Sequence, residues 1–208
     1  MEAITEKQAK TLNGFLMLFI ILLIMILNVF LFINSININE PMHLIFIIPI
    51  FLFTFIMLGG LTIIHPNESR VLILFGRYSG TIKESGFWWV NPFNVKTKVS
   101  LRIHNFLSEK IKVNDLHGNP IEIAAVIVWR VVDSAKAIFD VQNYEQFVSI
   151  QSETAIRSIA SQYSYDSHDE KMSLVGNQNE IAEELKQQTQ KRLEIAGIKI
   201  VETRISYL

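Results

Sequence analysis

The feature that most constrains this chain is a long stretch near its N-terminus that carries almost no charge. Residues 11–69 contain no Lys or Arg, and Glu40 and Glu68 are their only carboxylates. Two strongly apolar runs, 15–36 and 44–64, fill most of this stretch. Each run is about 21 residues long, so as a helix it measures roughly 31 Å and matches the hydrocarbon thickness of a bilayer. We therefore expect two transmembrane helices.

Basic residues lie at the two open ends of the expected hairpin (residues 15–64), on the same side of the membrane, and not in its linker. The linker, residues 37–43, has no Lys or Arg, whereas the polar lead (residues 1–14) and the segment after the second run contain Lys7, Lys10, Arg70, Arg77 and Lys83. Because cytoplasmic flanks carry the excess of basic residues, we expect the N-terminus and the following domain in the cytoplasm. The Ile- and Asn-rich composition favours a bacterial protein, which we therefore expect in the bacterial cell membrane.

The rest of the chain, residues 66–208, is long enough for one ordinary domain with its own core. The net charge of -1 provides no basic field for a nucleic-acid partner. The absence of cysteine excludes disulfides, thiol catalysis and thiolate metal sites.

Alternating and helical patterns divide this domain into strands followed by helices. Residues 70–75 form a β-branched run, and residues 121–132 alternate in polarity over the longest strand pattern of the domain. Helical spacing and box-like capping residues predict helices over 143–162 and 177–196. A last strand is expected over 198–205. Strands that precede helices indicate an α+β fold.

An aromatic cluster follows the first strand. Strand alternation places Phe87 and Trp89 on one face and Trp88 and Val90 on the other, and Phe93 follows closely. Such a strand needs two apolar environments. One is the domain core, and the other is either the lipid headgroup zone, which favours Trp, or further core or a subunit contact.

Charged residues on two elements are our candidates for contacts between subunits. The strand 121–132 has charged ends on its less apolar face, and the helix that begins near residue 177 has a face of mixed charge. Small sheets have unpaired edges that attract neighbouring chains, and confinement by membrane anchors raises the local concentration. The candidates are Glu122, Arg130, Glu183, Glu184 and Arg192.

Motifs of catalysis and of cofactor binding are missing from the sequence. The five histidines have no metal-ligand spacing, the sequence GRYSG lacks the GK[ST] ending of a phosphate loop, and no G-x-S-x-G elbow occurs. We therefore expect no catalytic site, no cofactor and no metal.

Four segments in this order resemble the SPFH family, also called the band 7 or prohibitin homology family (stomatins, prohibitins, flotillins). They are the entry strand with its FG turn and aromatic element over 66–93, the strand hairpin over 112–133, the helix over 137–159 and the Gly-Ile segment with the last strand over 192–205.

The resemblance implies a scaffold and not an enzyme, with a small, mainly antiparallel sheet and packed helices. Members are anchored in the bilayer, assemble as homo-oligomers into large rings or cages, and organise membrane patches or enclose membrane proteins and membrane-bound proteases. The expected second span departs from the single anchor or re-entrant hairpin of many members. A C-terminal coiled coil is also expected, beyond Leu208.

Two other functions compete with this interpretation. The helices of a channel or transporter subunit would line a pore, but the apolar runs contain few polar residues. A membrane-tethered hydrolase would need a nucleophile beside a base, and the sequence shows no such pattern.

Overall fold

The computed structural model describes residues 4–37, 44–166 and 172–208, and the chain folds into two compact units. We call residues 7–99 the hairpin unit, and residues 100–208, together with the first six residues, the sheet unit. The domain expected to begin at residue 66 is therefore divided between the two units.

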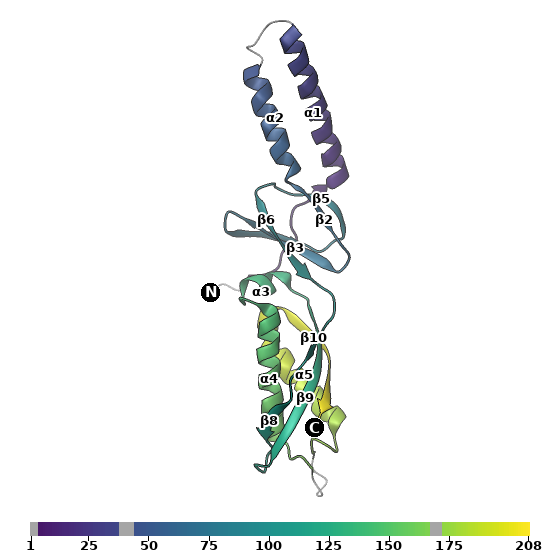
Figure 1. Ribbon diagram of the computed structural model, residues 1–208, viewed down its shortest axis with the longest axis vertical. Coiled ribbons are helices and arrows are strands. Elements are labelled where there is room, and N and C mark those ends of the chain that lie inside the picture. The colour runs from purple at the N-terminus through teal and green to yellow at the C-terminus, as the bar shows by residue number, and fades with distance from the viewer. Residues whose placement is uncertain (1–3, 38–43, 167–171) are drawn as a thin grey trace. The chain divides into compact units, whose positions relative to one another are not determined.

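Two helices dominate the hairpin unit and lie side by side (Figure 1). The first, α1, covers Gly14–Asn37, which confirms the predicted helix over 15–36. Its N-terminus is capped by Asn13, whose Oδ1 accepts hydrogen bonds from the N–H groups of Phe15 (3.0 Å) and Leu16 (3.2 Å). Among the described residues, α1 is the one helix long and apolar enough to cross a membrane.

The second helix is shorter than the sequence predicts. Helix α2 covers Leu44–Leu58, and the expected continuation to residue 64 is wrong, because Leu61–Ile64 is a strand, β2. Gly59 and Gly60 end the helix in a turn, with their N–H groups bonded to the carbonyls of Ile56 and Met57. Apolar composition does not distinguish a helix from a buried β-branched strand. The linker over 38–43 lies outside the described residues.

Two small sheets complete the hairpin unit. One has the order β1-β5-β2, and the other has the order β4-β3-β6. The first strand prediction, over 70–75, is confirmed by β3. The bounds are Leu12–Asn13 for β1, Glu68–Leu74 for β3, Arg77–Ile82 for β4, Gly86–Trp89 for β5 and Asn94–Ser100 for β6.

The sheet unit is built around one long strand, β9 (Pro120–Val131), which confirms the longest predicted strand. It pairs antiparallel with β10 (Ile198–Tyr207) on one side and with β7 (His104–Leu107) and β8 (Ile111–Asn114) on the other. The helices are α3 (Ser134–Phe139), α4 (Tyr144–Gln162), α5 (Gln178–Leu193) and the 3-10 turn Glu194–Ala196. The α+β class is confirmed.

The core of the sheet unit forms where β9 meets the helices. Ile123, Ile127 and Trp129 of β9 are buried, as the alternation predicts. Ile156 of α4 and Leu185 of α5 are buried as well, and α4 contacts β9 whereas α5 contacts β10.

Candidate functional site

The strand β5 joins the two helices to the rest of the hairpin unit. On one edge it pairs with β1, which passes directly into α1, and on the other with β2, which follows α2 after two glycines. Leu12 and Leu61 both lie opposite Trp89. The ends of both helices are therefore fixed to one short strand.

One face of β5 packs against the helix ends. The ring of Phe87 lies so close to Gly14 that a Cβ there would be 2.7 Å from its Cδ1 atom, and it meets the ring of Phe15 edge-on at 5.0 Å. The indole Nε1 of Trp89 donates to the carbonyl of Met57 at 2.9 Å, near the last turn of α2. These contacts hold both helices against one aromatic face.

The other face of β5 packs into a small core. Trp88 contacts the buried cluster of this unit, and its Nε1 donates to the carbonyl of Glu84 at 3.1 Å. The cluster comprises Ala9, Ile64, Leu72, Ile82 and Val90. The prediction that both faces of β5 need apolar surroundings is confirmed: they are the helix ends and this core.

Phe93 differs from the other three aromatic candidates because it is exposed. Its side chain is 54% accessible and stacks on Phe75, with 6.2 Å between the ring centroids. Phe75 is 84% exposed and has a positive φ of 47° in the turn between β3 and β4. Phe75 was predicted only as the last residue of a strand, although its place directly before a turn glycine indicates an exposed side chain.

The side chain of Lys96 binds main-chain carbonyls just after the end of α2. The ammonium of Lys96 donates to the carbonyls of Gly59 (2.6 Å) and Leu61 (3.4 Å), where the helix dipole favours a cation. Burial, and then the charge of Arg70, lowers the pKa of Lys96.

The buried carboxylate of Glu68 lies 2.5 Å from the ammonium of Lys98 and 3.1 Å from the guanidinium of Arg70. The hydrogen bond from Lys98 lowers the pKa of Glu68, burial opposes it, and the two positive charges lower it further. This carboxyl is therefore held in its charged form.

The five candidates for subunit contact do not come together in one site. Glu122 faces Lys112 at 3.7 Å on the surface, Arg130 is exposed, and Glu184 accepts from Gln188 at 3.1 Å. Arg192 is exposed near the end of α5.

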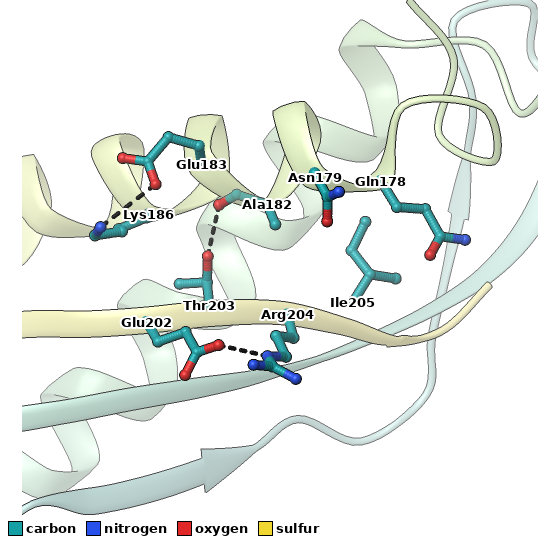
Figure 2. A pocket seen from close by; sticks show the side chains of 9 residues that line it. All are labelled: Gln178, Asn179, Ala182, Glu183, Lys186, Glu202, Thr203, Arg204 and Ile205. Atoms are coloured by element: carbon teal, nitrogen blue, oxygen red, sulfur yellow. Dashed lines mark hydrogen bonds and ion pairs between the residues drawn. The ribbon is translucent and has the colours of Figure 1, made fainter.

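Of the five candidates, Glu183 is the one that lines a groove of about 480 Å³ between α5 and β10 (Figure 2). The groove also contains Lys186, which lies 3.3 Å from Glu183, and the ion pair between Glu202 and Arg204. These three partners could not be predicted from the sequence, because they come together only when α5 packs against β10.

Comparisons with known proteins identify the family of this chain. Residues 62–207 match the model described as SPFH domain / Band 7 family. Two stomatin homologues, from Pyrococcus horikoshii and Pyrococcus abyssi, are each 31% identical over 119 residues, which cover 56% of this chain and 44% of the relative. An uncharacterized protein of Methanocaldococcus jannaschii is 27% identical over 108 residues, 50% of this chain and 53% of the relative.

The chain spans about half the length of the curated relatives it matches. The family match includes strands of the hairpin unit and nearly the whole sheet unit. The chain belongs to the SPFH domain / Band 7 family.

Proposed function

We propose that this protein is a membrane-anchored scaffold that assembles with copies of itself into a ring or cage. In this role it organises a patch of membrane or encloses client membrane proteins, membrane-bound proteases among them. Membership of the family and the likeness to stomatin homologues support a membrane-associated scaffold. The observation that carries the proposal is the pairing of β5 with both β1 and β2, because it joins both apolar helices to the folded strands of the hairpin unit.

The surface of the two helices supports a lipid environment. Most large apolar side chains of α1 and α2 are exposed, Phe15 (71%) and Phe46 (70%) among them. An exposed apolar surface of this extent needs a cover. By contrast Asn28 and Thr54 are buried, and Thr54 bonds the carbonyl of Ile50 at 2.7 Å, which favours an anchor over a pore.

The length of α1 supports one full crossing of the membrane. The 24 residues of α1 extend about 36 Å, more than the hydrocarbon thickness of about 30 Å. The 15 residues of α2 extend only about 22 Å, so the return crossing rests on the apolar surface of α2 and not on its length. The basic residues Lys7, Lys10 and Arg77 belong to the hairpin unit outside the helices, which favours a cytoplasmic domain.

The exposed aromatic pair supports a contact with the headgroup zone. Phe75 and Phe93 stack on each other, and Pro92 lies beside Gly59 at the end of α2. We therefore assign membrane contact to Phe93 and Phe75. We assign Phe87, Trp88 and Trp89 mainly to the packing of β5.

Orientation is tested by cysteine labelling, since the chain has no cysteine of its own. The variant Asn39→Cys places a thiol in the linker. We expect an impermeant maleimide to label it from outside intact cells. Protection there, with labelling only after lysis, would reverse the orientation.

The scaffold itself is tested by electron microscopy of the gently extracted full-length protein. We expect large closed particles with regular symmetry. Discrete small monomers at the same protein concentration would contradict the proposed assembly.

A further inference from the structure

The edge of β10 is closed over its first half by a side chain. In the order β10-β9-β7, β10 is an edge strand. The amide of Gln190 donates to the carbonyl of Ile198 at 3.0 Å and accepts from the N–H of Ile200 at 2.8 Å. This carboxamide takes the place that the main chain of a neighbouring strand would occupy.

Within the described part of the chain, no strand pairs with the second half of the same edge. Ala125 exchanges hydrogen bonds with Ser108 on the β7 side of β9, at 3.0 and 2.9 Å. Main-chain groups alternate between the two sides of a strand. The N–H and C=O of Val126 therefore face β10, where Val126 lies opposite Arg204. The main-chain groups of Thr203, and of Ile205 two residues on, therefore face outwards into the groove of about 480 Å³ below α5.

The opposite edge of the sheet, β7, has no neighbouring strand at the residues level with Thr203, within the described part of the chain. Ile127 lies opposite Thr203 of β10 and opposite Phe106 of β7. Because Phe106 faces β9, the main-chain groups of Asn105 and Leu107 face outwards. Among the described residues, β7 pairs with β9 alone.

We propose that copies of this chain join head to tail, with β7 of one copy entering the groove and pairing in parallel with β10 of the next. In a parallel pair, a residue bonds the two residues that flank the one opposite. With Thr203 opposite Phe106 of the neighbour, its N–H donates to the carbonyl of Asn105 and its carbonyl accepts from the N–H of Leu107. The inference rests on the proposed assembly and names its interface.

Direction and charge fit this contact. Both β7 and β10 run antiparallel to β9, so copies that keep one orientation in a membrane present these edges to each other in parallel. The groove contains two anions and two cations, Glu183 with Lys186 and Glu202 with Arg204. Residues 104–107 carry no carboxylate and no Lys or Arg. A head-to-tail contact that repeats by rotation closes a ring.

The test uses two cysteines in the otherwise cysteine-free full-length protein. The proposed register places Arg204 of one copy opposite Leu107 of the next, at the roughly 4.8 Å between neighbouring strands, which suits a disulfide. Within one chain both residues lie opposite Val126 on its two sides, about 9.6 Å apart and too far for a bond. Both side chains are exposed.

Mild oxidation of membranes that contain R204C/L107C should give a ladder of covalent oligomers on a non-reducing gel. A mixture of the two single variants should stop at dimers that contain one chain of each. Each single variant alone should stay monomeric. Large particles without cross-links in the double variant would overturn the inference and leave the proposed scaffold standing, and small particles without cross-links would overturn both.

Dimers from R204C alone would also overturn it, because they require two equivalent β10 edges to meet. A second pair of variants tests the hydrogen bonds. Leu107→Pro removes an outward N–H, which an edge strand tolerates, and should abolish large assemblies, whereas Leu107→Ala should keep them. Full assembly of the proline variant would contradict the pairing.

Discussion

The two units obtain their order in different ways. In the sheet unit, one strand of 12 residues pairs with three others, and helices with regular spacing cover it. In the hairpin unit, strands of two to four residues from distant parts of the chain meet around β5. The first arrangement depends on a buried apolar surface along a regular element. The second depends on close contacts at glycines and on aromatic side chains between helix ends.

The sheet unit should be most sensitive to lost volume at the centre of β9. Ile127 is fully buried and lies opposite both Thr203 and Phe106. We expect Ile127→Ala to lower the free energy of unfolding by about 2–5 kcal/mol, because it leaves a cavity between two strand pairs. Denaturant unfolding followed by Trp129 fluorescence measures the loss, and Ile150→Ala on the exposed face of α4 is the control.

The hairpin unit should be most sensitive to added volume at a glycine. A Cβ at Gly60 would lie 2.4 Å from both the carbonyl oxygen of Val90 and the Nε1 of Trp89. We expect Gly60→Ala to cost about 1–3 kcal/mol, because the backbone must move. The fluorescence of Trp89 should change.

Gly76→Ala is the matched control for that substitution. A Cβ at Gly76 meets nothing within 4 Å, so only its φ of 80° opposes alanine. Its cost should be the smaller of the two, near 1 kcal/mol. An equal loss in both variants would show that backbone conformation, and not contact with β5, decides the stability of this unit.

Acid should destabilise both units by different mechanisms. Burial raises the pKa of Asp115, but hydrogen bonds from Asn119, Tyr165 and His117 outweigh it and lower the pKa to about 2. Glu68 has a lowered pKa beside Lys98 and Arg70. The ordinary pKa is 4.5 for Glu68 and 3.8 for Asp115, and both are lower in the folded state. Each carboxylate therefore stabilises the fold fully above its ordinary pKa, and this stabilisation is lost as pH falls through the folded-state pKa.

High salt should distinguish the stability contribution of Glu68 from that of Asp115. The partners of Glu68 are charged, so 1 M salt should weaken its contribution at neutral pH. The partners of Asp115 are backbone and amide N–H groups, at 2.8–3.2 Å, so its contribution should change little. Acid titrations of Glu68→Gln and Asp115→Asn at low and high salt measure both effects. A larger salt effect in the Asp115 comparison would reverse the assignment.

The same contrast explains how much the sequence could predict. The alternation over β9 and the capping Asn143, which accepts from Glu145 and Gln146, predicted β9 and α4 because the local pattern matches the final contacts. The second predicted cap, Asn177, makes no capping hydrogen bond, and α5 ends at Leu193 before a 3-10 turn. The strand β2 was mistaken for helix because its four residues are as apolar as the helix before it. The groove at β10 joins residues from two elements, and no spacing within either element indicates it.

The most direct test of the membrane anchor compares the tryptophans of the two units, using variants that retain only Trp89 or only Trp129. In vesicles with bromine atoms just below the headgroups, the partly exposed Trp89 beside the end of α2 should be strongly quenched. Trp129 is 4% exposed within the sheet unit and should keep its fluorescence. Equal quenching of both, or none at Trp89, would contradict the claim that β5 fixes this domain at the bilayer surface.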